Sequence, residues 1–197
     1  MNQPLSSDAL AQLFTEARTF NGYLDKPVPV EMLHALWDLM KMGPTSANQL
    51  PARIVWCVSQ EAKDKLAALA SGNNAPKIQA APVAAILAMD ENFHDYLPEL
   101  YPALDARSWF ANDEPLRRES AFRNSSLQGG YFILAARALG LGVGPMSGFD
   151  KAAVDAAFFP DQPSYKSNFI ATLGYGDPEK VHPRAPRPEF GKFNRID

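Results

Sequence analysis

Residues 140–149 read GLGVGPMSGF, and this glycine-rich stretch decides which fold the chain can have. It follows the apolar, alanine-rich pattern of a long helix that we expect over 116–139. A dinucleotide-binding loop has the pattern G-x-G-x-x-G, follows a strand and opens a helix. Because neither the spacing nor the position fits, we reject a Rossmann fold. We expect a helix C-cap at Gly140, followed either by a plain tight turn or by a loop whose backbone approaches a flat ligand closely.

Hydrophobic periodicity along the rest of the chain predicts many helices and few strands. Strands and helices do not alternate regularly, which favours an α+β fold over a doubly wound sheet. We find no repeat and no linker, so one domain is expected over 1–197. The aromatic- and proline-rich segment 90–115 has no clear period and is typical of a lid or a subunit interface. The expected helices cover 6–17, 29–42, 60–70, 116–139 and a short stretch after 150, the strands 54–58, 83–89 and 169–173, and a polar connection 73–78.

The overall composition excludes several classes of function. The chain has 197 residues, of which 46% are hydrophobic and 21% charged, as in an ordinary globular domain. Its net charge of -3 argues against a nucleic-acid partner, because such proteins need a positive field. A single cysteine, Cys57, and three scattered histidines predict no disulfide and no metal site. The longest apolar run, 83–89, falls short of the roughly 20 residues of a membrane span, and no signal pattern is visible, so we expect a cytoplasmic protein.

An arginine and a hydroxyl residue follow the first expected helix. Arg18 carries a permanent positive charge and Thr19 a hydroxyl, a pair suited to holding a phosphate. A helix C-terminal cation beside a turn hydroxyl is the simpler alternative. A phosphate carries close to two negative charges, so its site needs several cations. The basic tail can supply them from Arg184 or Arg187, unless the tail is only a solvated end.

A loop dense in hydroxyls and carboxamides follows the second expected helix. Thr45, Ser46 and Asn48 come directly after Gly43-Pro44, and such groups suit a polyol. Turn chemistry accounts for one or two of these side chains, but less readily for a cluster. The loop is therefore a candidate site for a sugar-like chain.

Two further features suit a flat ring. Asn74 and Lys77 precede a strand, and a cation near such a ring would stabilise its anionic reduced form, although a solvated lysine is the simpler alternative. Gly129 and Gly130 lie inside the long helix, where each costs about 1 kcal/mol relative to alanine. They are tolerated where another backbone or a flat ligand comes close, and Asn124, earlier on the helix, can face that ligand. Phosphate, polyol and planar ring together describe flavin mononucleotide (FMN).

In its order of motifs the chain resembles the nitroreductase family of flavoproteins, and the likeness spans nearly its whole length. Within that family, residues 17–33 are most similar to the malonic semialdehyde reductases of pyrimidine utilisation. Many relatives carry a second basic residue at the position of Asn21, so the phosphate charge must here be met elsewhere. The motifs are Arg18-Thr19-x-Asn21, Pro44 to Asn48, Ala135 to Gly142, Pro145 to Phe149, and the basic tail.

The resemblance implies a small, mostly antiparallel sheet flanked by helices, in an intertwined homodimer with two FMN sites at the subunit interface. The polar loop after the second helix would reach FMN from the partner subunit, and the backbone of residues 146–148 would lie near flavin N5. Either Arg184 or Arg187 would close on the phosphate. The residues so implied to bind FMN are Arg18, Thr19, Asn21, Thr45, Ser46, Asn48, Asn74, Lys77, Asn124, Pro145, Met146, Ser147, Gly148, Arg184 and Arg187.

The activity so implied is FMN-dependent oxidation of NADH or NADPH, with the flavin and no side chain as the catalytic group. No ribose-reading motif selects one nicotinamide over the other. Hydride would pass through flavin N5 in a ping-pong sequence to a small aldehyde such as malonic semialdehyde, giving 3-hydroxypropionate. A nitroaromatic or a quinone is the alternative acceptor, and no membrane partner is expected. A flavin-binding protein without turnover, or a dimeric module without flavin, remains a competing interpretation.

Overall fold

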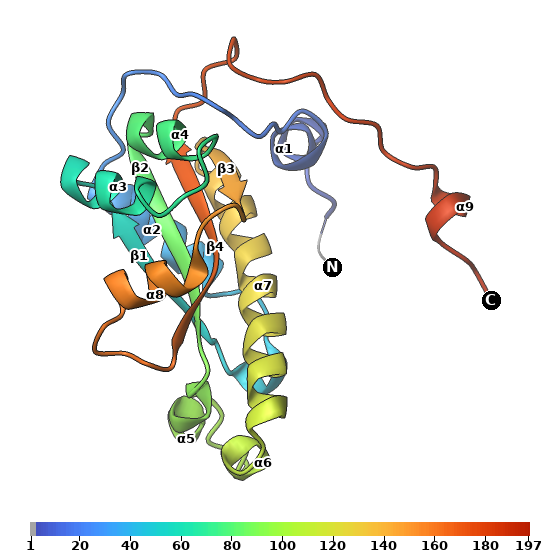
Figure 1. Ribbon diagram of the computed structural model, residues 1–197. Coiled ribbons are helices and arrows are strands. Elements are labelled where there is room, and N and C mark those ends of the chain that lie inside the picture. Colours follow the sequence, from blue (N-terminus) through green and yellow to red (C-terminus); the bar gives the residue numbers. More distant parts are fainter. Residues whose placement is uncertain (1–2) are drawn as a thin grey trace.

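A four-stranded sheet between two layers of helices forms the body of the protein in the computed structural model, which describes residues 3–197 (Figure 1). The strand order is β1-β2-β4-β3, and every neighbouring pair is antiparallel. Ile86 in the middle of β2 therefore lies opposite Val55 on one side and Ile170 on the other. The strands are β1 (Ala52–Cys57), β2 (Val83–Asp90), β3 (Gly142–Met146) and β4 (Tyr165–Gly174).

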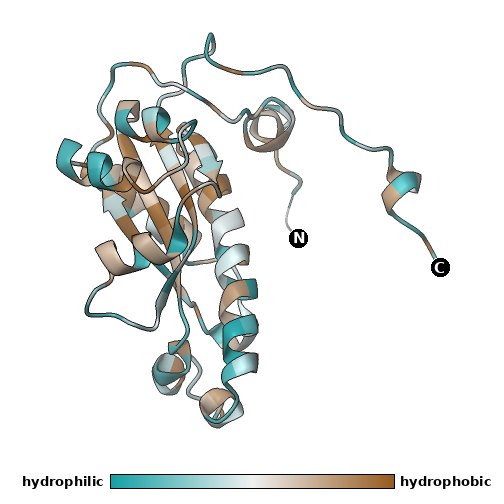
Figure 2. Ribbon diagram, viewed as in Figure 1, coloured by the Kyte–Doolittle hydropathy of each residue, from teal (hydrophilic) through white to brown (hydrophobic). Residues whose placement is uncertain are grey.

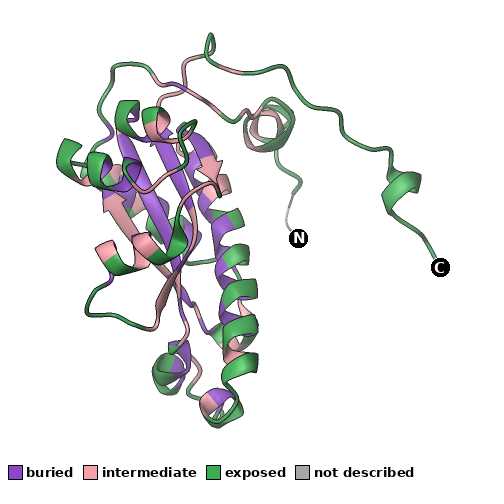
Figure 3. Cartoon of the chain, viewed as in Figure 1, coloured by how far each residue is buried: buried purple, intermediate pink, exposed green. Residues whose placement is uncertain are grey.

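The apolar run of β2 is buried on both faces of the sheet, as Figure 3 shows in purple. Val83, Ala85 and Leu87 face one hydrophobic core, and the alternate residues Ala84 and Ile86 face the other. This alternation follows from the two-residue period of a strand. The run is hydrophobic throughout because helices cover both sides, and Figure 2 shows this brown centre.

Two helices cover the first face of the sheet and three cover the second. Leu36 of α2 and Phe132 of α7 pack into the first core, while Leu66 of α3, Ile78 of α4 and Val154 of α8 pack into the second. The fold class expected from the sequence, α+β with a small antiparallel sheet flanked by helices, is confirmed. The bounds are α2 (Val30–Met40), α7 (Glu114–Ala138), α3 (Gln60–Ala67), α4 (Ala75–Ala80) and α8 (Lys151–Phe158).

The aromatic segment after β2 folds onto the start of α7. Phe93, Leu97 and Phe110 form a third small core there with Ala121 of α7. The segment expected to be irregular thus contains three short helical elements at the far end of α7 (Figure 1). They are η3 (Phe93–Tyr96), α5 (Leu97–Leu100) and α6 (Ser108–Ala111).

The N-terminal helical elements and the tail lie away from the sheet. Figure 1 shows the tail passing α1 and running outward, and Figure 3 shows it exposed along its length. The N-terminal helix expected from the sequence is present as two short pieces joined without a break. The elements are α1 (Ser7–Leu10), η1 (Ala11–Thr15) and α9 (Phe190–Phe193).

Two local predictions are wrong. The stretch after Gly140 does not begin with a turn or a binding loop. Its residues Gly142–Met146 form β3 and pair with β4 over their whole length. A β-carbon at Gly144 would lie 2.6 Å from the Thr172 hydroxyl oxygen, so glycine at this position lets the side chain of the neighbouring strand come close. The expected polar connection contains α4, which buries only Ile78 and so shows little periodicity.

Within residues 3–197, no helix has both the length and the apolar character needed to cross a bilayer.

Candidate functional site

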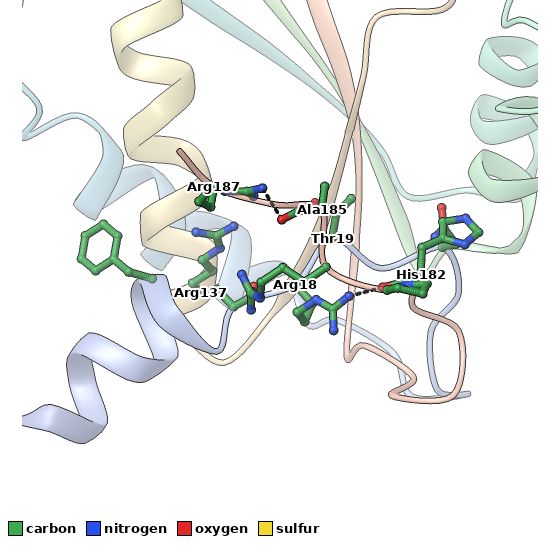
Figure 4. Close-up of a pocket in the computed structure, with 11 residues that line it drawn as sticks. Arg18, Thr19, Arg137, His182, Ala185 and Arg187 are labelled. Atoms are coloured by element: carbon green, nitrogen blue, oxygen red, sulfur yellow. Dashed lines mark hydrogen bonds between the residues drawn. The ribbon is translucent and has the colours of Figure 1, made fainter. Parts of the chain in front are cut away.

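Four arginine side chains line a pocket of about 410 Å³ between the N-terminal segment, the end of α7 and the tail (Figure 4). They are Arg18, Arg137, Arg184 and Arg187, and Thr19 lies beside them. Asn21 also lines the pocket and is half-buried. The structure therefore brings together the phosphate-binding residues expected from the sequence, although more than 160 residues separate Arg18 from Arg184.

Hydrogen bonds between the N-terminal segment and the tail shape this pocket. Arg18 Nη2 donates to the His182 carbonyl oxygen, and Arg184 Nη2 donates to the Ala17 carbonyl oxygen at 3.1 Å. Arg187 Nη1 donates to the Ala185 carbonyl oxygen at 3.0 Å, within the tail itself. Across residues 3–197, no carboxylate lies within 4.0 Å of any of these guanidinium groups or of Arg137. The pocket thus holds several cations without a counterion, which suits a multiply charged anion.

Arg137 is a pocket residue that the sequence analysis missed. It stands in the last turn of α7, where a basic residue usually serves only the helix dipole. Its Nη1 donates to the Leu13 carbonyl oxygen at 2.8 Å, and its Nε is buried without a hydrogen-bond partner among the described residues. Burial, and then the charge of Arg184, lowers the pKa of Arg137. No local signal in the sequence marks this residue, because its role depends on distant segments.

A second cluster of polar groups lies beyond the C-terminal end of β3. Asn74 Nδ2 donates to the Gly148 carbonyl oxygen at 3.0 Å, and the Ser71 hydroxyl donates to the same oxygen at 2.9 Å. Lys77 follows in α4 and is half-buried. Thr19 forms a parallel bridge with Val143, near the start of β3. The arginine pocket and the Asn74–Gly148 contact therefore lie near opposite ends of a strand about 15 Å long.

A mostly apolar groove of about 400 Å³ runs between α7 and the end of β3. Its lining includes Pro145, Met146 and Ser147, the loop residues singled out from the sequence. The two helical glycines in its wall differ. A β-carbon at Gly129 would lie 2.5 Å from Phe169 Cε1, whereas one at Gly130 would have no atom within 4 Å. Packing within the chain thus explains Gly129, and the open space at Gly130 belongs to the groove.

The polar loop after α2 has a strained and well-fastened backbone. Its helical turn is η2 (Ser46–Asn48), and Ala47, Asn48 and Leu50 have φ angles of 49°, 49° and 39°. Each such left-handed residue costs about 1–3 kcal/mol and persists only where the surroundings hold it. Leu50 N donates to Thr45 Oγ1 at 3.2 Å, and Asn48 Nδ2 donates to the carbonyl oxygen of Leu100 at 2.8 Å. The conformation is therefore imposed by its neighbours, as at many binding loops.

Asn124 of α7 supports this loop from within the protein. Its Oδ1 accepts a hydrogen bond from Ser46 N at 2.8 Å, and its Nδ2 donates to the Ser120 carbonyl oxygen at 2.9 Å. The side chain is buried, with 2% exposed. In the chain Asn124 thus holds the loop, and it does not line the arginine pocket.

The loop and the arginine pocket lie at different ends of α7. Asn124 and Arg137 are 13 residues apart in that helix, which corresponds to about 20 Å. A single chain therefore does not bring Thr45, Ser46 and Asn48 to the arginines.

Residues 3–197 also contain no group of three His, Cys, Asp or Glu side chains placed to hold a metal ion.

Comparisons with known proteins give one consistent result. Residues 15–175 match the nitroreductase family. A Burkholderia lata protein, provisionally named NADH dehydrogenase/NAD(P)H nitroreductase, is 56% identical over 193 residues, which are 98% of each chain. A Stenotrophomonas maltophilia protein with the same provisional name is 55% identical over 196 residues, covering 100% of both.

Solved structures show the same fold at lower sequence identity. A Bacillus subtilis protein provisionally named a nitroreductase has a TM-score of 0.88 at 24% identity, covering 98% of this chain and 100% of that one. An Exiguobacterium sibiricum protein provisionally named a nitroreductase, solved in complex with FMN, has a TM-score of 0.81 at 19% identity, covering 100% of both chains.

Proposed function

Because this chain belongs to the nitroreductase family, we propose that it is an FMN-dependent oxidoreductase that takes its electrons from NADH or NADPH. The observation that carries the proposal is the pocket of Arg18, Arg184 and Arg187, joined through β3 to the contact between Asn74 and Gly148. Cations at one end and amide groups at the other suit a ligand with a phosphate and a polar flat ring.

The residues present fit FMN in charge and in hydrogen-bonding chemistry. Arg18, Arg184 and Arg187 would hold the phosphate, and Thr19 and Asn21 would contact the phosphate or the ribityl chain. Bound FMN would supply the redox chemistry, which is hydride transfer from the nicotinamide to an acceptor. The protein's share is positioning and electrostatics, so no acid–base pair is required.

The other end of the site would meet the ring. Asn74 and Lys77 would contact its polar edge, where the ammonium of Lys77 would stabilise the negative charge of the reduced form. The groove beside Pro145, and the backbone of Met146, Ser147 and Gly148, would lie along the ring near N5. Gly130 would leave room for the ring on the side of the groove formed by α7.

We further propose that the site is completed by a second copy of the chain in an intertwined dimer. The strained loop of Thr45, Ser46 and Asn48 is built for contact, yet about 20 Å of α7 separates its support from the pocket of its own chain. Large apolar side chains stay exposed on α7 and the tail, a pattern typical of a subunit interface. They include Phe122, Leu127, Tyr131, Phe190 and Phe193.

For the acceptor we propose a small aldehyde of the malonic semialdehyde type, on the likeness of residues 17–33. Its carbonyl carbon would receive the hydride and its oxygen a proton, giving 3-hydroxypropionate. A nitro compound is the second candidate, because the names of the Burkholderia and Stenotrophomonas relatives point to nitroreductase activity.

Anaerobic flavin spectroscopy tests this function. Purified protein should be yellow, should bleach on addition of NADH or NADPH, and should regain colour when an acceptor is added. A panel of malonic semialdehyde, a nitroaromatic compound and a quinone, mixed with the reduced protein in a stopped-flow instrument, ranks the acceptors by reoxidation rate. A protein without flavin contradicts the proposal outright. A flavin that neither nicotinamide bleaches identifies a passive binder.

A further inference from the structure

We infer that Arg137 is a fourth ligand of the cofactor phosphate and the one that is oriented before the cofactor binds, an inference that rests on the function proposed above. Figure 4 shows the Arg137 side chain directed into the same space as Arg18 and Arg187. Neither the order of motifs nor the local sequence pattern around Arg137 assigns it this role.

Arg137 differs from the other three arginines in the rigidity of its support. Arg184 and Arg187 stand on the exposed tail, and Arg18 on an irregular segment. Arg137 belongs to a 25-residue helix whose neighbouring residues Ala135 and Ala136 are buried in the main core. A ligand on a rigid element loses less conformational freedom on binding than one on a loop.

Hydrogen bonds made by Arg137 and Gln12 fasten the end of α7 to the N-terminal segment. Arg137 Nη1 donates to the Leu13 carbonyl oxygen at 2.8 Å, and Gln12 Nε2 donates to the Arg137 carbonyl oxygen at 2.6 Å. One end of the guanidinium is therefore anchored to the N-terminal segment. A planar guanidinium with a set orientation is suited to a bidentate contact with phosphate oxygens.

The remaining donors of Arg137 point to a missing acceptor. A guanidinium carries five N–H groups, and the bond to Leu13 uses one. Its Nε is buried and has no partner among the described residues, so the N–H groups of Nη1 and Nη2 that remain are the ones open to a ligand in the pocket. The pKa of Arg137 is also lowered by burial and by the Arg184 charge. An anion in the pocket would offset the repulsion between Arg137 and Arg184.

A purely structural role is the competing explanation. In that case Arg137 would only join α7 to the N-terminal segment through Leu13. This role needs a hydrogen-bond donor but no charge. The two roles predict different effects on ligands that differ only in the phosphate.

Titration of the flavin-free protein with FMN and with riboflavin separates the two roles. Arg137→Gln removes the charge and keeps an amide donor on a shorter side chain. We expect it to weaken FMN binding, followed by quenching of flavin fluorescence, by about tenfold or more, and to change riboflavin binding by less than about twofold. The matched control is Arg118→Gln, near the other end of α7, where Arg118 forms exposed ion pairs with Glu91 and Glu114. The control should bind both flavins as the unmodified protein does.

Equal weakening of FMN and riboflavin would show that Arg137 is structural, and unchanged binding of both would show that it does not contact the phosphate. Either result overturns the inference while leaving the proposed function intact. An unmodified protein that binds no FMN instead overturns the proposed function. If the Gln variant fails to fold by circular dichroism, Arg137→Lys is titrated in the same way. Its loss of planar geometry should weaken FMN several-fold and riboflavin not at all, and the same two results would contradict the inference.

Discussion

The two adjacent glycines of α7 should respond in opposite ways to alanine. In a helix interior, alanine is more stable than glycine by about 1 kcal/mol. At Gly130 nothing lies within 4 Å of the added methyl group, so Gly130→Ala should keep this gain. At Gly129 the methyl group would lie 2.5 Å from Phe169 Cε1 and 2.8 Å from its Cζ, and overpacking of this kind costs about 1–3 kcal/mol. The free energies of unfolding of the two variants should therefore differ by about 1–3 kcal/mol.

Thermal unfolding of the flavin-free proteins measures this difference. For a domain of this size, 1 kcal/mol shifts Tm by about 2–4 °C, so Gly129→Ala should melt at least about 2 °C below Gly130→Ala. All samples need one protein concentration, because association shifts Tm. A third variant, Gly130→Leu, should fold but lose most flavin, since its side chain enters the groove.

The reasoning fails if the two alanine variants melt together. It also fails if Gly130→Ala is the less stable one, because the space at Gly130 would then be filled in the folded protein. Gly130→Leu with full flavin content would show that the groove does not receive the ring.

Three further outcomes are expected. Arg18→Ala should remain folded by circular dichroism but bind FMN at least about tenfold more weakly, because a charge-assisted contact is lost; unchanged flavin content would refute the phosphate assignment. Burial lowers the pKa of His94, so below pH 6.5 the unfolded chain takes up a proton that the folded chain resists. Urea denaturation should show stability falling from that pH downward, and less so in His94→Gln; parallel pH profiles would contradict this. Burial raises the pKa of Cys57 to about 11, so iodoacetamide at pH 8 should label the thiol only in urea, and rapid labelling of the native protein would be inconsistent with its position in β1.

Local patterns predicted most helices and the central strands correctly. The apolar spacing of Leu33, Leu36 and Met40 corresponds to the buried face of α2, and the long apolar run before Asp90 is β2. These elements could be predicted because their periodicity is written in consecutive residues. The α4 helix was missed because six residues with one buried side chain carry almost no period.

The sequence also led us to expect that Arg18 meets an arginine of the tail, and Arg18, Arg184 and Arg187 do line one pocket. Arg137 could not, because its pattern is that of an ordinary helix end and only the Leu13 carbonyl and the tail give it a further role. The strain at Ala47 and Asn48 was equally hidden, since left-handed φ angles are imposed by contacts such as Ser46 with Asn124.

The sequence alone determined where the longer helices lie, which strand is buried on both faces, and which chemical groups the chain offers to a ligand. Only the tertiary structure decided that the glycine-rich stretch is a strand and which four arginines share a pocket. The physical reason is that capping and periodicity act between residues a few positions apart. The pairing of β3 with β4 and the meeting of Arg18 with the tail depend instead on contacts between distant segments.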